Sequence, residues 1–198
     1  MKRVRRFFIK LARKICHSGG HGIHSPFAFD FVANVVYNPC PYYFFDTFAA
    51  SEKERKVGEL LFRIVERYKL LSVVTVGQQH PFLAAYTVAV SSAIKRYDIE
   101  LVKTGEKEVD KGLFLEPTLF LFDDDATKEG WMEFYREIKD SIHDHSVIAV
   151  MDIQENIEKR AIWNEFSFSQ TGVMFDLYDI GIIFFKKGLH KKRYIVSF

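Results

Sequence analysis

The chain has 198 residues, of which 48% are hydrophobic, 16% aromatic and 27% charged, and this composition excludes an intrinsically disordered protein. Its length predicts one domain with a core of ordinary size. The formal net charge of +2 divides into +7 within residues 1–18, which hold no acid, and −5 in the rest of the chain. We call residues 1–18 the basic arm. Because the remainder is mildly acidic, nucleic-acid binding by the whole molecule is not indicated.

Cysteine content and hydropathy indicate a cytoplasmic protein. The two cysteines, Cys16 and Cys40, form neither a disulfide framework nor a zinc motif. No stretch reaches the roughly 18 uninterrupted apolar residues of a membrane span. Lys10, Arg13 and Lys14 interrupt any apolar segment that a signal peptide would need, so no export is expected.

Residues 1–16 of the basic arm are predicted to form an amphipathic helix. One face is Lys and Arg, and the apolar stripe on the other consists of Val4, Phe7, Phe8, Leu11, Ala12 and Ile15. We expect this stripe to pack on the chain's own domain or on a second subunit. An interfacial helix on a membrane surface, or an arm that contacts nucleic acid, is the alternative interpretation.

Two further helices are predicted before the first strand. Ser25-Pro26 begins one of them, since Ser is a good N-cap and Pro suits the first helical turn, and Asn38-Pro39 ends it. Ser51 begins the other, whose apolar stripe continues regularly from Val57 to Tyr68. An aromatic-rich connection joins the two helices.

From residue 70 onward, β-rich runs alternate with helical patterns. The predicted strands are 72–76, 98–103, 118–122 and 146–151. The expected helices cover 82–95, a segment with Trp131 and Ile138 on its apolar face, and about 156–166. A closing β-hairpin joins 173–178 to 181–185 across Asp179-Ile180, and 194–198 adds a last strand. This order predicts an α/β, Rossmann-like fold: a mainly parallel sheet with helices on both faces and an antiparallel edge.

Carboxylates follow two of the predicted strands, at the edge where open α/β sheets bind ligands. Asp123, Asp124 and Asp125 follow 118–122, and Asp152 follows 146–151. Such groups can bind a metal or act as a general base, but Asp is also a favoured helix cap. Capping is the preferred interpretation of the three consecutive acids, and both interpretations stay open for Asp152. The histidines form no convincing ligand set, so no metal is predicted.

Both ends of the chain resemble a known family. Residues 22–31, Gly-Ile-His-Ser-Pro-Phe-Ala-Phe-Asp-Phe, are similar to the opening of a bacterial group of class I methyltransferase-like proteins that depend on S-adenosylmethionine (SAM). Residues 173–186 resemble the closing β-hairpin of the same group. The resemblance implies a seven-stranded, mostly parallel sheet with one reversed strand, and a SAM site. We expect residues 1–50 to be a helical extension of an α/β domain, 51–198, in one compact unit.

The cofactor site implied by this resemblance departs from the family pattern. The first strand of the family ends in an acid and a glycine, which lets the backbone approach SAM. Here Thr75 takes the place of the acid, Gly77 matches the glycine, Gln78 follows it, and His80-Pro81 replaces a later glycine. The second strand of the family ends in an acid that accepts hydrogen bonds from the ribose. We place Lys103 there, and Lys cannot accept them.

The middle of the chain is short for the family. Residues 103–117 leave no room for the strand and helices that usually lie there, so one strand is expected to be missing or reduced. Asp123, Asp124 and Asp152 resemble the acidic strand ends that face substrate or metal in related O-methyltransferases. They are the catalytic candidates if the protein is active.

The sequence therefore predicts a shortened, degenerate methyltransferase-like protein, a pseudoenzyme with an eroded SAM site that acts in binding or assembly. The alternative is an active SAM-dependent methyltransferase with a small-molecule acceptor. A third hypothesis is an adaptor that contacts a membrane surface or nucleic acid through residues 1–16. The partner would be a small molecule or a protein, and the abundance of Phe and Tyr is compatible with a homo-oligomer.

Overall fold

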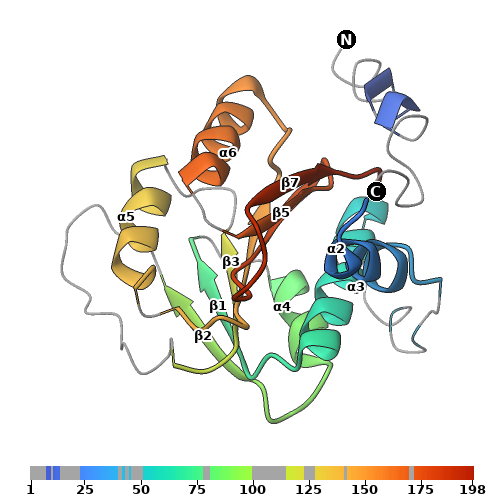
Figure 1. Cartoon of the computed structure of the whole chain (residues 1–198). Coiled ribbons are helices and arrows are strands. Elements are labelled where there is room, and N and C mark those ends of the chain that lie inside the picture. The colour runs from blue at the N-terminus through green and yellow to red at the C-terminus, as the bar shows by residue number, and fades with distance from the viewer. Residues whose placement is uncertain are drawn as a thin grey trace.

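The computed structural model of the chain (Figure 1) describes residues 8–9, 11–13, 23–39, 42, 45, 51–77, 81–99, 115–122, 128–140, 142–169 and 172–198. Its strands are β1 (Ser72–Val76), β2 (Lys95–Ile99), β3 (Thr118–Phe122), β4 (Val147–Met151), β5 (Val173–Asp176), β6 (Ile180–Phe184) and β7 (Lys192–Ile195). Its helices are α2 (Pro26–Phe31), the π-helical turn η1 (Val32–Val36), α3 (Glu52–Tyr68), α4 (Pro81–Val88), α5 (Lys128–Ile138) and α6 (Ile157–Ser169).

The described strands form one seven-stranded sheet in the order β2-β1-β3-β4-β6-β5-β7. Neighbouring strands are parallel except at β6, which is antiparallel to both β4 and β5. The predicted fold class is confirmed: an α/β protein with a mainly parallel sheet, one reversed strand and an antiparallel C-terminal hairpin. In the part of the chain that the structure describes, β2 forms one edge of the sheet and β7 the other.

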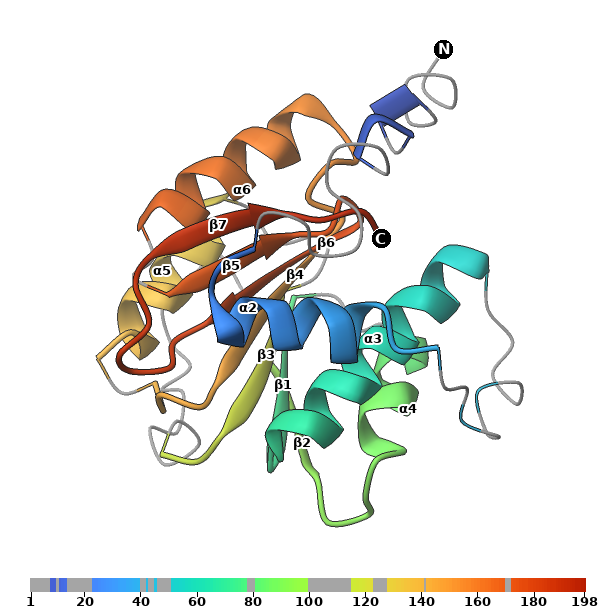
Figure 2. The ribbon, with the colours of Figure 1, turned by 45° about the vertical axis from the view of Figure 1, so that its right-hand side comes forward.

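Helices cover both faces of the sheet (Figure 2). α2, α3 and α4 lie on one face, and α5 and α6 lie on the other. A hydrophobic core lies on each face of the sheet, and successive side chains of a strand belong to opposite cores. Val73 of β1 packs on the α2 and α3 side, and the next residue, Val74, packs on the α5 and α6 side. Strands β1, β3 and β4 are buried throughout, as strands covered on both faces must be.

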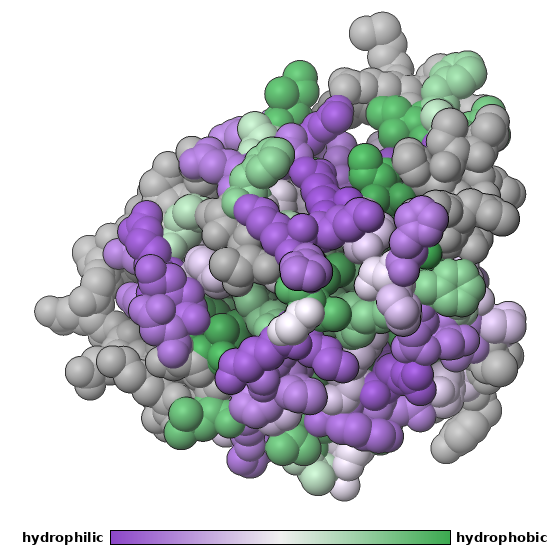
Figure 3. All heavy atoms as spheres, in the orientation of Figure 1, coloured by the Kyte–Doolittle hydropathy of each residue, from purple (hydrophilic) through white to green (hydrophobic). Residues whose placement is uncertain are grey.

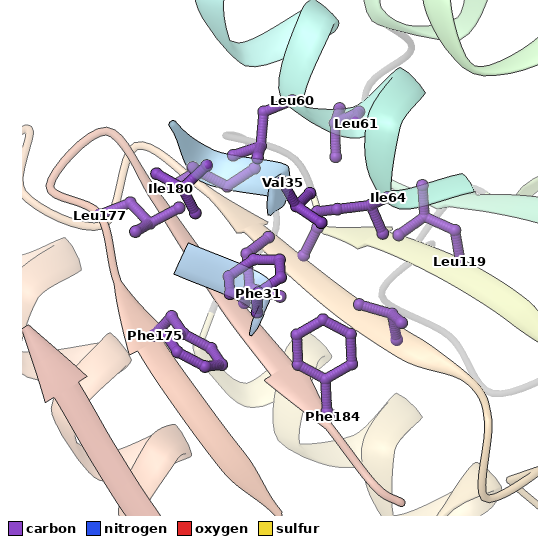
Figure 4. Close-up of a cluster of buried hydrophobic side chains, with 14 of the residues drawn as sticks. Phe31, Val35, Leu60, Leu61, Ile64, Leu119, Phe175, Leu177, Ile180 and Phe184 are labelled. Carbon is purple, nitrogen blue, oxygen red and sulfur yellow. The ribbon is translucent and has the colours of Figure 1, made fainter. Parts of the chain in front are cut away.

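The first described helices join the core through aromatic packing. The Phe31 ring of α2 lies 4.4 Å from Phe175 and 5.0 Å from Phe184, measured between ring centroids. Figure 4 shows these rings together with leucine and isoleucine side chains of α3. Ser25 caps α2 by accepting from the Ala28 amide, and Pro26 is its first residue, as the sequence predicts. Phe31, the last residue of the motif that carries the family resemblance, thus packs α2 against the C-terminal hairpin.

Helix α3 begins at the capping box that its sequence encodes. The Ser51 hydroxyl accepts from the Glu54 amide at 3.3 Å, and the Glu54 carboxylate accepts from the Ser51 amide at 2.9 Å. The helix ends at Lys69, which adopts the left-handed conformation. These contacts hold the first turn of α3 in place, and that turn supplies a side chain to the candidate site.

The second strand lies earlier in the chain than predicted. Helix α4 ends at Val88 and not at residue 95, because the chain turns between residues 89 and 94, where the Ile94 amide donates to the Ser91 carbonyl at 3.2 Å. Strand β2 then covers Lys95–Ile99, so it begins three residues before the predicted strand 98–103 and shares residues 98–99 with it; residues 100–103 lie outside the described residues. Three of its five side chains are exposed and the other two, Tyr97 and Ile99, are half buried, and an edge strand of this kind gives no continuous apolar signal.

The closing hairpin also turns at a different place. Its turn comprises residues 177–179, so Ile180 already belongs to β6 and the predicted turn across Asp179-Ile180 is wrong. Tyr178 has a positive φ of 75°. This conformation is rare for a bulky residue, so a tyrosine at this position gives no sequence signal for the turn. The last strand begins two residues earlier than predicted, at Lys192, and ends at Ile195.

The basic arm meets the domain with an unexpected face. Of the predicted helix 1–16, the described residues are 8–9 and 11–13, and these are helical. Ile9 is half buried and the Arg13 side chain is 11% exposed, whereas Phe8 is 62% and Leu11 41% exposed. The described members of the apolar stripe are therefore largely exposed, and packing of the stripe on its own domain or on a second subunit stays a prediction. Positions 9 and 13 lie one turn apart on another side of the helix, and the ion pair of Arg13 holds that side inward.

The described residues include no helix long and apolar enough to cross a membrane.

Candidate functional site

The carboxyl ends of β1, β3, β4 and β5 lie at one edge of the sheet, because these strands share one direction. Gly77 follows β1, Asp152 follows β4, and Asp176 is the last residue of β5. The helical residues of the basic arm lie beyond the same edge (Figure 2). Asp123 and Asp124, which follow β3 in the sequence, lie outside the described residues, and so does Gln78.

The end of β1 keeps the glycine turn but not the acid. Gly77 has a φ of 107°, which favours glycine, and its amide donates to the Ile99 carbonyl at 3.0 Å. Thr75 stands where the family has its acid, with 3% of its surface exposed, and it pairs in register with Asp98 of β2 and Leu121 of β3. The glycine turn after β1 is therefore present, and the nearby Thr75 supplies a buried neutral hydroxyl.

The earlier position of β2 changes which residue follows that strand. Ile99 is its last residue and pairs with Val76, so the next residue in the sequence is Glu100. Lys103 lies three residues further along and, like Glu100, outside the described residues. In the sequence, an acid thus follows the last described residue of the second strand, and the family resemblance implies an acceptor for the ribose at the end of that strand. The role predicted for Lys103 stays a prediction.

Asp152 is an ion-pair partner and not a helix cap. Its carboxylate pairs with the ammonium group of Lys53, from the first turn of α3. The cap of α6 is Asn156, whose side-chain oxygen accepts from the Lys159 amide at 2.8 Å. Asp152 itself has a φ of 53°, and its amide donates to the Asp179 carbonyl at 2.7 Å. Of the two interpretations left open by the sequence, capping is excluded for this residue.

Asp176 is the centre of a buried charge cluster that sequence reasoning missed. Its side chain is 1% exposed. Arg13 of the basic arm donates to Oδ1 at 2.7 Å, and Arg193 of β7 donates to Oδ2 at 2.7 Å. The Tyr178 amide donates to Oδ1 at 3.1 Å, and the Gln154 amide group to Oδ2 at 3.4 Å. One carboxylate therefore ties together the N-terminal arm, the closing hairpin and the last strand.

The charges of this cluster decide its protonation. Burial raises the pKa of the Asp176 carboxyl, but the hydrogen bonds and positive charges of Arg13 and Arg193 outweigh burial, so the pKa lies below its ordinary value. Both guanidinium groups also rest on aromatic rings. Arg13 lies 5.2 Å from the centroid of Tyr178, and Arg193 lies 5.6 Å from that of Trp163. We call Asp176, Arg13 and Arg193 the arm clamp.

A sequence signal for Asp176 did exist. It is the one acid in the apolar run from Val173 to Tyr178, and a charge inside a buried strand needs a partner. Nothing local identified those partners, because Arg13 is 163 residues away along the chain. As for metals, the described residues hold no group of three or more His, Cys, Asp and Glu side chains that could bind one.

Comparisons with known proteins give only distant similarities. No protein-family model and no curated protein matches the chain. Among solved structures, a Klebsiella pneumoniae protein provisionally assigned as an O-methyltransferase aligns with a TM-score of 0.45 at 10% identity, over 80% of this chain and 96% of its own. A Podospora anserina methyltransferase bound to S-adenosylhomocysteine has a TM-score of 0.42 at 11% identity, over 94% and 97% of the two chains. A cofactor-bound protein from MTB aligns with a TM-score of 0.43 at 10% identity, over 85% of this chain and 94% of its own. Similarities this remote carry no argument about the site.

Proposed function

We propose that this is a methyltransferase-like protein with an eroded SAM site, which acts without catalysis in binding or assembly. The observation that supports this most directly is the pairing of Asp152, which follows β4, and Asp176, at the end of β5, with the chain's own cations. Lys53 holds Asp152, and the arm clamp holds Asp176. A carboxylate held in this way is available to a substrate proton or a cofactor only after its pair is broken.

The residue at the end of β1 adds to this support. SAM is a cationic ligand, and an acid beside its site would offset that charge. The Thr75 hydroxyl is neutral and almost fully buried, so it supplies no charge and little contact surface. The described residues thus keep the turn at Gly77, with the neutral Thr75 two positions before it.

The decisive experiment is calorimetric titration of the full chain with SAM and with S-adenosylhomocysteine, after circular dichroism has shown that the protein is folded. We expect no binding heat from either ligand. One-to-one binding with a Kd of about 1 μM, equivalent to about −8 kcal/mol, would overturn the proposal. A thermal-shift measurement at saturating ligand gives an independent readout, since a bound ligand raises the melting temperature.

An active SAM-dependent methyltransferase with a small-molecule acceptor is the second candidate. Two observations favour it: the positive φ of Gly77, and Glu100 directly after β2. If SAM binds, Glu100→Gln should lower the affinity for SAM by about 10- to 100-fold, because a hydrogen bond to a charged group is lost. The matched control is Lys103→Gln, which changes a neighbouring position. Equal effects of the two variants would remove Glu100 as the ribose acceptor.

Under this second candidate function, Asp152 is the catalytic carboxylate that lies within the described residues. Asp152→Asn keeps a residue that tolerates positive φ while removing the charge. Turnover should then fall by about 10²- to 10⁴-fold if the carboxylate acts as a general base. Asp140→Asn, at an exposed site after α5, is the control. Unchanged turnover in Asp152→Asn would leave the residue a purely structural partner of Lys53.

A further inference from the structure

The described members of the apolar stripe, Phe8, Leu11 and Ala12, are exposed at the surface of the molecule. Arg13 and Ile9 face the domain, while Phe8, Leu11 and Ala12 are exposed on another side of the same helical turns. Figure 3 shows hydrophobic atoms exposed at this end of the molecule. The arm clamp decides this orientation, because the Arg13 side chain reaches a carboxylate that is itself buried. The ion pair between Arg13 and Asp176 therefore determines which side of these helical residues faces away from the domain.

The charge of the arm identifies what fits on this stripe. Residues 1–18 carry seven Lys and Arg and no acid, whereas the rest of the chain sums to −5. The arm of a second copy would bring the same positive charge, so pairing of two arms is opposed by repulsion. Nucleic acid would satisfy the cations but would leave Phe8 and Leu11 in water. An anionic lipid surface accepts both, with apolar side chains among the acyl chains and cations at the headgroups.

We propose that the basic arm docks this protein on anionic membrane surfaces, with Phe8 and Leu11 inserted and the arm clamp holding the domain on the opposite side of the helix. The acidic body then stays on the water side, away from the negative headgroups. Attachment is peripheral, because the inserted side chains come from one side of the helical residues 8–9 and 11–13. This role is independent of SAM binding, so the calorimetric test above and the test below can fail separately.

The test is co-sedimentation of the full chain with vesicles of phosphatidylcholine, alone or mixed with phosphatidylglycerol. We expect binding to the mixed vesicles only, and weaker binding as salt screens the cations. The double variant Phe8→Ser and Leu11→Ser should lower the affinity by at least about tenfold, since two apolar contacts are lost. Phe168→Ser, which changes an equally exposed phenylalanine on α6, should not.

Three results would overturn the proposal. The first is no binding to the anionic vesicles at low salt, and the second is equal binding by the double variant and the unchanged chain. The third is a dimer in analytical ultracentrifugation that the double variant abolishes, which would assign the stripe to a second copy. All of these side chains are exposed, so circular dichroism should show that every variant folds.

Discussion

At the scale of single side chains, Asp176 shows what it takes to keep a charge inside the protein. Transfer of a carboxylate from water to a buried site costs several kcal/mol unless partners compensate. Arg13 and Arg193 each contribute a short hydrogen bond with a full positive charge. Since both guanidinium groups are mostly buried as well, loss of the carboxylate would leave two cations without a counter-charge.

We therefore expect Asp176→Asn to be strongly destabilising. The free energy of unfolding should fall by about 3 kcal/mol, near the lower end for a broken buried pair because Arg193 keeps some solvent contact. Urea denaturation at neutral pH measures the change. Asp98→Asn is the matched control: its pair with Arg96 is partly exposed on the edge strand, and it should cost less than about 1 kcal/mol. Similar losses in both variants would contradict a special role for the arm clamp.

The same residue predicts a pH dependence. Its folded-state pKa lies below the ordinary value of 3.8, so its contribution to stability is fully present above that value. As the pH falls below 3.8 and through the folded pKa, the folded state loses this contribution. The stability difference between the unchanged chain and Asp176→Asn should accordingly shrink in acid and stay constant from pH 5 to pH 7. A difference that stays the same at pH 3 would argue against the charge as its source.

At the scale of elements, the sequence predicts strands well where they are buried on both faces. β1 and β3 occupy the predicted residues, because a short continuous apolar run bounded by a glycine or by acids is typical of a strand that is buried on both faces. β2 was misplaced because an edge strand carries Lys95, Arg96 and Asp98 at solvent-facing positions. The candidate site inherits that error, since the residue after β2 is Glu100 and not Lys103.

Contacts between distant elements could not be predicted from local pattern. The pairing of Lys53 with Asp152 joins residues 99 positions apart, and only the packing of α3 on the sheet brings them together. The exposed orientation of Phe8 and Leu11 depends likewise on a partner for Arg13 near the other end of the chain. Periodicity predicted a helix over residues 1–16, of which the described residues 8–9 and 11–13 are helical, but it carries no information about which face meets the domain.

The packing of α3 on α4 leads to a prediction at Gly58. An added Cβ there would lie 2.4 Å from Cδ2 of Tyr86. Alanine normally stabilises a helix by about 1 kcal/mol over glycine, but overpacking costs about 1–3 kcal/mol. We expect Gly58→Ala to lower the free energy of unfolding. In a Tyr86→Leu background, which removes the ring, the same change should become neutral or stabilising. A loss that persists there would place its cause outside this contact.

At the scale of the whole molecule, one sheet separates two cores. Both tryptophans, Trp131 and Trp163, belong to the core on the α5 and α6 side. Phe31 belongs to the other core, where it joins α2 to the closing hairpin. The strands between the two cores are continuous, so the loss of one core should be felt in the other.

Phe31→Ala tests this coupling. Removal of a buried phenylalanine costs about 3–5 kcal/mol. Tryptophan fluorescence and far-ultraviolet circular dichroism should report the same lowered denaturation midpoint, although both tryptophans lie across the sheet. Phe29→Ala, two residues away and half exposed, should leave both midpoints nearly unchanged. Separate midpoints for the two signals in Phe31→Ala would show that the cores unfold independently.

The arm clamp also has a consequence for how the protein is made. Arg13 leaves the ribosome early, but its carboxylate follows 163 residues later. At about 5–20 residues per second, synthesis of that stretch takes roughly 8–30 s. Throughout this interval the nascent arm lacks the contact that orients it. A surface that attracts the cations of the arm can therefore meet it before Asp176 is available to bind Arg13.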